Sequence, residues 1–206
     1  MSLNLDLKLI ENSLSSYRPK RKFLRHLAKR SSVAIILRQK AENHEVLMIK
    51  RADREGDPWS GHMAFPGGRR ESQDKDSYAT AVRETNEEVG IMLPECARYI
   101  GRLSDKHARP TKYNLGMYVT PFVFMLDKKT DFKINREVAS LVWIPLEFFS
   151  NTENQEEMFW QYRSRNIAVP CYKYEEFTIW GLSLSMLLEL TEVISHQKKF
   201  PQQKTL

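Results

Sequence analysis

A cluster of glutamates on one expected helix constrains this chain more than any other feature. The chain reads Phe-Pro-Gly-Gly at positions 65–68 and Arg-Glu-Thr-Asn-Glu-Glu-Val-Gly-Ile at positions 83–91. At about 100° per residue on a helix, Glu84, Glu87 and Glu88 fall within an arc of about 100°. Like charges at these spacings cost about 0.2–0.5 kcal/mol per pair. A hard divalent cation offsets that cost, because Mg²⁺ prefers carboxylate oxygens and tends to bring substrate phosphates with it.

The opposite face of the same helix is expected to be buried. Tyr78, Val82, Thr85 and Val89 share that side of the helical wheel, and Ala79 lies close to them. One face is therefore packed and the other charged, and we expect the three glutamate side chains to be exposed. A plain solvated face is the structural alternative, since acidic clusters on exposed helices are common.

These two motifs resemble the sequence box of the Nudix hydrolases. Gly68 opens the pattern, Asp74 takes the first acidic place after five residues, and positions 83–91 close it. Eight residues rather than seven separate Asp74 from Arg83, and Thr85 stands where an apolar residue is usual. A loop or helix start absorbs one extra residue easily. The core Arg-Glu-x-x-Glu-Glu-x-Gly is intact, so the resemblance is specific.

The resemblance implies which residues carry the chemistry. Cleaving a pyrophosphate requires charge neutralised on the phosphoryl oxygens and a water presented in line, and bound metal can supply both. By resemblance, Glu84, Glu87 and Glu88 are catalytic carboxylates that hold one to three Mg²⁺ or Mn²⁺ ions, with the Gly68 carbonyl as a further ligand. Arg83 is expected to orient these acids, and its spacing allows an ion pair with Glu87.

Further acids lie outside the helix. Asp74 is expected to shape the loop, with Glu71 as its competitor because of the extra residue. Relatives commonly recruit one more acid, and the candidate here is Glu137, six residues before Trp143. A surface acid at a strand start is the alternative for Glu137. The remaining acidic cluster is expected to be a solvated loop: Glu153, Glu156 and Glu157.

Length and composition indicate a single globular domain with a modest extension. The chain has 206 residues, 41% of them hydrophobic and 28% charged, as in soluble proteins. We expect a helical and basic extension at 1–30, a hydrolase domain at 31–196 and a polar tail at 197–206. No apolar run reaches the 18 or so residues that a bilayer requires, and the N-terminus lacks a secretory signal. We expect reduced cysteines and a cytoplasmic location.

The net charge of +6 is concentrated in one segment. Between Arg18 and Arg30 lie seven cations and no acid. Three interpretations remain open: a solvated segment, assistance with an anionic small substrate, or contact with RNA or a membrane. No RNP-type motif or zinc-finger spacing supports a nucleic-acid partner, so we expect none.

Periodicity predicts an α+β fold. Strands are expected at 32–37, 45–49, 99–103, 116–126 and 139–144, and helices at 3–14, 77–89 and 178–196. Loops are expected at 39–44, 53–61 and 104–114. Strands that frame one helix, with another helix closing the chain, indicate an αβα sandwich with a mixed sheet, which the Nudix resemblance also implies.

The segment before the glycines resembles the signature of the coenzyme A pyrophosphatases of this family. Gly61, Glu71 and Asp74 fit that signature in register, whereas Leu47 and Arg51 fit only with two extra residues before Gly61. The remaining departures are Met48, Ile49 and Asp57, and Asp57 places a negative charge where the signature has an arginine.

Coenzyme A or an acyl derivative is the leading substrate, and substrate-binding residues are expected among nearby cations: Arg51, Arg69, Arg70, Lys106, Arg109 and Lys112. Of these, the four arginines are preferred, because arginine suits bidentate phosphate contacts. The alternatives are nucleotide sugars, dinucleoside polyphosphates or nucleoside triphosphates. A non-catalytic nucleotide- or RNA-binding module is the rival of another class, and the intact glutamates argue against it. Pairing into a homodimer is left open.

Overall fold

Strand β1 (Lys29–Lys40) lies in the middle of the structure, a computed structural model. The described residues are 7–21, 28–57, 59–108, 116–162 and 165–199, without the side chains of 162 and 197–199. The apolar run of β1 is buried on both sides: Ala34 and Ile36 join one hydrophobic cluster, and Ile35 and Leu37 join the other. A strand covered on both faces needs such a continuous apolar run.

The central sheet is mixed, as predicted. Among the described residues it has eight strands, in the order β3-β2-β1-β7-β5, with β4 beside β1, β6 beside β7 and β8 beside β2. β1 and β7 are parallel, and the other pairs are antiparallel. The other strands are β2 (Asn43–Arg51), β3 (Met63–Ala64), β4 (Gly67–Arg69), β5 (Ala97–Arg102), β6 (Lys106–Ala108), β7 (Met117–Leu126) and β8 (Val138–Pro145).

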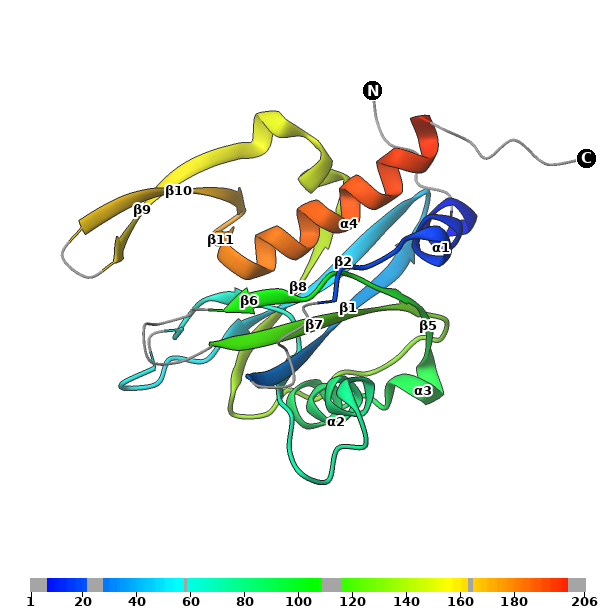
Figure 1. Ribbon diagram of the computed structural model, residues 1–206, viewed down its shortest axis with the longest axis horizontal. Coiled ribbons are helices and arrows are strands. Elements are labelled where there is room, and N and C mark those ends of the chain that lie inside the picture. The colour runs from blue at the N-terminus through cyan, green and yellow to red at the C-terminus, as the bar shows by residue number, and fades with distance from the viewer. Residues whose placement is uncertain (1–6, 22–27, 58, 109–115, 163–164, 200–206) are drawn as a thin grey trace, which may run out of the picture.

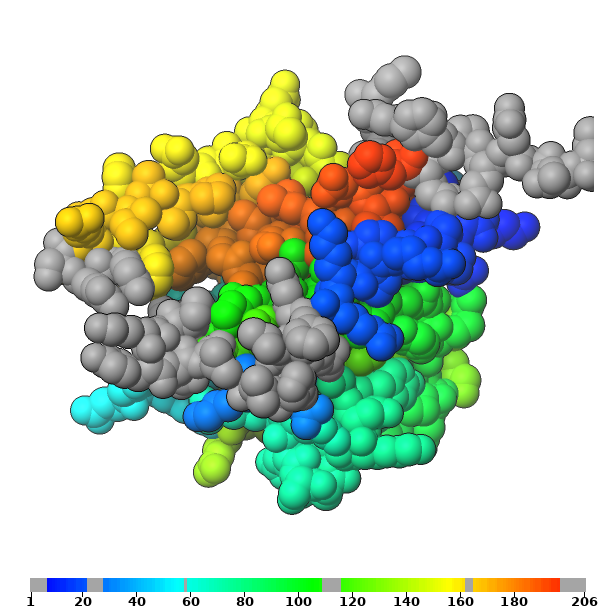
Figure 2. Space-filling view, viewed as in Figure 1, coloured from blue at the N-terminus to red at the C-terminus, as the bar shows by residue number. Residues whose placement is uncertain are grey.

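Helices cover both faces of this sheet, so the predicted αβα sandwich is confirmed (Figure 1). On one face lie α2 (Ser77–Val89) and the short α3 (Leu93–Cys96). On the other lie α4 (Gly181–Lys199) and α1 (Leu7–Ser16), which pack against each other. In the space-filling view the C-terminal segments, yellow to red, form one layer and the region of α2 forms the opposite one (Figure 2).

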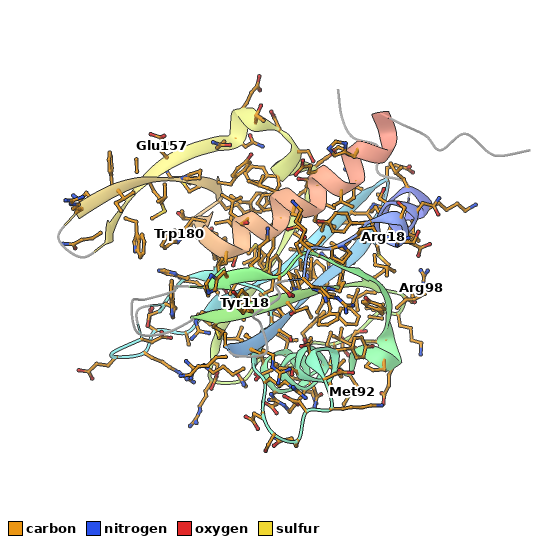
Figure 3. The ribbon with its side chains drawn as sticks, in the orientation of Figure 1. Arg18, Met92, Arg98, Tyr118, Glu157 and Trp180 are labelled. Atoms are coloured by element: carbon orange, nitrogen blue, oxygen red, sulfur yellow. The ribbon has the colours of Figure 1, made fainter. Side chains whose placement is uncertain are left out.

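A second sheet of three strands accompanies α4 and was not predicted. Its order is β11-β10-β9, with bounds Phe177–Trp180, Arg165–Tyr174 and Gln155–Tyr162. Two short 3-10 turns, η2 (Leu146–Ser150) and η3 (Thr152–Asn154), lead into it. Glu153, Glu156 and Glu157 are exposed, as predicted, but the last two lie on β9 rather than in a loop. In Figure 3 the labelled Glu157 lies on the outer side of this sheet.

Other predictions hold with shifted bounds. The five predicted strands are β1, β2, β5, β7 and β8, and the predicted N-terminal helix is α1. The terminal helix begins at Gly181, because residues 178–180 pair within β11. β6 occupies part of the predicted loop 104–114. Both cysteines are free thiols, and within the described residues no helix is long and apolar enough to cross a bilayer.

The first half of β1 and the end of β2 are not paired with each other, and this gap in the sheet positions the glycine pair of the site. β1 pairs with β2 only from Ile36 onward, while its first half pairs with β4. The end of β2 pairs instead with β3. The segment 63–69 therefore fills the gap between the two strands, and Ala34 N donates to Pro66 O at 2.8 Å. This insertion brings the glycine pair against the start of the sheet.

Candidate active site

Both ends of α2 are fixed by specific contacts. Asp76 caps its start, where the carboxylate accepts a hydrogen bond from Ala79 N at 2.8 Å. Gly90 ends it with φ 74°, a left-handed conformation that favours glycine. The last helical carbonyls accept from the neighbouring loop: Glu88 O from Asn135 N and Val89 O from Lys133 N. The helix therefore has the predicted bounds, and its far end is joined to the loop before Glu137.

Glu84 lies directly over Gly68. A Cβ atom at position 68 would come within 2.4 Å of the Glu84 carboxyl group, a distance that real structures do not tolerate. The Gly68 carbonyl, which the Nudix resemblance assigns to metal, accepts from Ser31 Oγ at 2.6 Å. Only glycine at this position allows the carboxylate of Glu84 to approach the backbone so closely.

Glu88 is buried and the Glu84 side chain is only 15% exposed, so the expectation that all three glutamates are exposed holds only for Glu87. The side chain of Glu88 passes beneath the glycine segment, where Glu88 Oε2 accepts from Gly67 N at 2.8 Å, and the residue is only 4% exposed. Burial raises the pKa of Glu88 to about 7; the Gly67 N–H and Arg51 oppose that rise, while Glu84 and Glu137 add to it. A poorly solvated carboxylate among other acids favours the approach of a cation.

Arg83 connects the acids of the site. Its Nε and Nη2 bind Asp74, its Nη1 binds Glu87 at 3.1 Å, and its Nη2 also binds Glu84 at 3.0 Å. The ion pair predicted with Glu87 is therefore present, and Arg69 O accepts from the same guanidinium at 3.0 Å. The hydrogen bond to Asp74 is the largest of several effects that raise the pKa of Arg83. The guanidinium thus holds acids from both the loop and the helix.

Asp74 is the loop acid that the structure buries. Its Oδ2 accepts from Glu71 N at 2.8 Å and from Thr80 Oγ1 at 3.0 Å, in addition to its bonds with Arg83. The hydrogen bond from Arg83 is the main cause that lowers the pKa of Asp74 to about 2. The competitor Glu71 is exposed, although its charge contributes to a raised pKa of Glu84, whose main cause is burial.

Two ion pairs border the carboxylates. Arg51 Nη2 lies 2.7 Å from Asp57 Oδ2, and Arg54 Nη2 lies 3.0 Å from Glu137 Oε1. Glu137 is 40% exposed in its side chain and immediately precedes β8. Its influence on the pKa of Glu88 places it near the site. Both interpretations of Glu137, a surface acid or a participant, are compatible with this position.

The other predicted substrate-binding cations differ in their surroundings. Arg69 is exposed, whereas Arg70 Nη2 donates to Asp74 O and Lys75 O at 2.9 and 3.0 Å and so supports the loop. Lys106 pairs with Glu189 of α4 at 2.5 Å. Arg109 and Lys112 lie outside the described residues, as does the middle of the basic segment, 22–27.

The residues present suit a hard divalent cation. Three carboxylates and one carbonyl make an all-oxygen donor set, which Mg²⁺ and Mn²⁺ prefer. In the part of the chain that the structure describes, no three His, Cys, Asp or Glu side chains are already gathered as a metal site. Arg83 holds Glu84 and Glu87, and Gly67 holds Glu88.

A cavity beside Arg51 went unnoticed in the sequence. Its volume is about 340 Å³, and its lining includes Trp160 from β9 and Trp180 from β11. Both tryptophans belong to the second sheet, which periodicity did not predict. Two of the four tryptophans of the sequence lie in this second sheet, and they are its one visible signal of the cavity.

The sequence matches the NUDIX domain family over residues 28–163. The matched span includes the central sheet, α2 and the loop with Glu137, and it covers more than half of the chain. The chain belongs to the Nudix hydrolase family. Nudix hydrolases act on nucleoside diphosphate derivatives and generally use divalent metal ions. β11 and α4 lie beyond the matched span.

Similar proteins come from distant organisms. The uncharacterized protein C14C4.10c of Schizosaccharomyces pombe is 37% identical, over 71% of this chain and 50% of that protein, so the chain spans about half of that relative's length. The uncharacterized Nudix hydrolase NudL of Yersinia pestis is 30% identical, over 73% of this chain and 72% of its own. A MutT/nudix family protein from Enterococcus faecalis shares the fold, with a TM-score of 0.50 and 14% identity over 96% of this chain and 73% of its own.

Proposed function

We propose that this Nudix chain is a metal-dependent pyrophosphohydrolase that cleaves the diphosphate of a nucleoside diphosphate linked to another group. The observation that carries the proposal is the placement of Glu84 and Glu88 against the Gly67-Gly68 backbone, with Glu87 beside them through Arg83. A purely structural helix has no need to bury one glutamate and press another onto a glycine.

Each residue has a distinct task in the proposed reaction. Glu84, Glu87, Glu88 and the Gly68 carbonyl would hold Mg²⁺ or Mn²⁺, which neutralises charge on the phosphoryl oxygens when bound. Arg83 keeps the carboxylates in position through its hydrogen bonds to Asp74 and the helix. Glu137 accepts the proton of the attacking water. Its partly exposed side chain allows water to reach it.

Coenzyme A or one of its derivatives is the favoured substrate, with 3',5'-ADP and phosphopantetheine as products. The support is the upstream resemblance to coenzyme A pyrophosphatases. The charge of Asp57, which departs from that signature, is matched by Arg51 at 2.7 Å, so Asp57 repels a substrate phosphate less than an unpaired acid would. The same pair occupies Arg51, which leaves Arg69 as the exposed arginine among the described candidates.

A substrate panel tests both the proposed reaction class and the proposed substrate. We expect Mg²⁺-dependent cleavage of coenzyme A, with kcat/KM at least about tenfold above that for 3'-dephospho-coenzyme A, which corresponds to about 1.4 kcal/mol in the transition state. Equal or better use of dephospho-coenzyme A, ADP-ribose or a nucleotide sugar would reassign the substrate and leave the reaction class intact. Absence of cleavage across the panel would favour a nucleotide-binding module instead.

A further inference from the structure

A row of aromatic rings lines one side of the cavity beside Arg51. The ring centroids of Trp59 and His62 lie 5.6 Å apart, those of His62 and Trp180 lie 5.1 Å apart, and those of Trp180 and Trp160 lie 5.4 Å apart. These residues come from the loop before β3, from β11 and from β9. Figure 3 labels Trp180 at the junction of β11 and α4, close to β6. We call this space of about 340 Å³ the tryptophan cavity.

Arg51 joins the tryptophan cavity to the carboxylates. The residue ends β2 and lines the cavity, and the residue after it contacts the candidate acid Glu137, because Ala52 N donates to Glu137 O at 2.8 Å. Arg51 Nη2 is held by Asp57, while its Nε is buried without a hydrogen-bond partner. A substrate whose diphosphate lies at the carboxylates would therefore have one of its two ends beside this cavity.

The lining distinguishes between an aromatic base and an apolar group. Most of the lining is carbon, because Met63, Ala64, Ala108 and Leu182 lie beside the tryptophan rings, and Ser183 Oγ already donates to Met63 O at 3.0 Å. A buried base has several ring and amino groups that need hydrogen bonds, and each one left unpaired weakens binding about five- to hundredfold. An apolar chain loses no hydrogen bonds and gains about fourfold for each buried methylene.

We propose that the tryptophan cavity binds an apolar group attached to the nucleoside diphosphate, on the far side of the diphosphate from the nucleoside. This inference rests on the proposed function and narrows its substrate class: among coenzyme A and its derivatives it favours those that carry an apolar acyl group, because the hydroxyl and amide groups of phosphopantetheine would themselves lose water in the cavity without gaining partners. It makes the cavity wall that contains Trp160 of β9, Trp180 of β11 and the start of α4 the part of the fold that selects the substrate. Nucleotide sugars would bind poorly, because their hydroxyl groups would lose water without gaining partners.

The test is a series of ADP esters that carry methyl, butyl, hexyl or octyl groups, bound in EDTA so that no turnover is expected. We expect affinity to rise about fourfold for each added methylene until the cavity is full. Trp160→Ala should flatten this dependence. Phe159→Ala is the matched control, because Phe159 is the next residue on the same strand and is 76% exposed, away from the cavity lining.

Leu182→Asn provides a second variant in case Trp160→Ala unfolds, since Leu182 lines the cavity and is already 36% exposed. It too should flatten the series. Binding that strengthens with the length of the alkyl group, without any hydrolysis in Mg²⁺, would support the assignment of the cavity and refute the proposed reaction. Hydrolysis with no dependence on chain length, or equal flattening by Phe159→Ala, would overturn the cavity assignment.

Discussion

Gly68 and the carboxyl group of Glu84 are so close that there is no room between them for a side chain at position 68. A methyl group at position 68 would meet the flexible end of Glu84 at 2.4 Å, so the carboxylate has to move while the backbone does not. We expect Gly68→Ala to change the free energy of unfolding by less than about 1 kcal/mol. The same change should lower Mg²⁺-dependent kcat/KM at least about 100-fold. Full activity in this variant would show that the position of Glu84 is irrelevant.

Glu137 is the acid for which two roles compete. If it accepts the proton of the attacking water, Glu137→Gln should lower kcat by about 10²–10⁴-fold and alter KM little. The matched control is Glu157→Gln, an exposed glutamate on β9, which should have no effect. A loss of less than about threefold in kcat would return Glu137 to the role of a surface acid paired with Arg54.

Asp74 links the stability of the loop to pH. Its folded pKa of about 2 lies below the ordinary 3.8, so its stabilisation is present above pH 3.8 and is lost as the pH falls from about 4 to about 2. The difference corresponds to about 2 kcal/mol. We expect Asp74→Asn to be less stable than the wild type at pH 7 and nearly equal to it at pH 2. Urea unfolding at both pH values measures the difference in the free energy of unfolding between the two proteins. A difference that is the same at pH 7 and pH 2 would contradict this role of Asp74.

Some features of the site could be predicted from the sequence, and others could not. The bounds of α2 and the pairing of Arg83 with Glu87 follow from spacing, because helical periodicity and capping are local. The burial of Glu88 cannot be predicted from spacing. It depends on a hydrogen bond from Gly67, which is distant in the sequence and lies in the segment that fills the gap between β1 and β2. The contact between Glu84 and Gly68 is equally non-local, although the motif that contains both residues was recognised.

At the scale of elements, Glu189 joins two segments to α4, one at Tyr17 and one at 104–106. Its Oε1 accepts from Tyr17 OH at 2.8 Å, beyond α1, and from Ser104 N at 2.7 Å, while Oε2 pairs with Lys106 of β6. Burial raises the pKa of Glu189, but the hydrogen bond from Lys106 and the bonds from Ser104 and Tyr17 outweigh it and leave the pKa below its ordinary value.

We therefore expect Glu189→Ala to lower the free energy of unfolding by about 3–5 kcal/mol, because it leaves Lys106 poorly solvated and unpaired. Glu189→Gln should cost less, since it keeps the shape and an acceptor oxygen. Denaturant titration of both variants checks this order. A loss of less than about 1 kcal/mol in Glu189→Ala would show that α4 does not depend on this contact.

The elements that the sequence missed have a common physical cause. Among the described residues, β9 and β10 pair with each other, and β10 also pairs with β11. β9 carries the exposed neighbours Glu156 and Glu157, and the first four residues of β10 are exposed, so an apolar alternation is weak there. β6 has three residues and depends on its pairing with β7. Short strands that owe their existence to a neighbour leave little periodic signal.

At the scale of the whole molecule, the αβα sandwich positions two neighbouring sites, the carboxylates of α2 and the tryptophan cavity. The matched Nudix span places the carboxylates of α2 against the opening between β1 and β2, and it also supplies Trp160 of β9 to the tryptophan cavity. Trp180 of β11 and the start of α4 complete the wall of that cavity. Catalysis is thus proposed for the shared part of the fold, and selection for a cavity that the shared part and the segment after it build together. The two assignments can fail independently.

The most direct test measures Mg²⁺-dependent cleavage of the diphosphate by the wild type, Glu87→Gln and Glu88→Gln, with folding checked by thermal unfolding. We predict cleavage by the wild type that EDTA abolishes, and a loss of at least about 100-fold in kcat/KM in each folded variant. Full Mg²⁺-dependent activity in both variants would contradict the assignment of the α2 glutamates as the metal site.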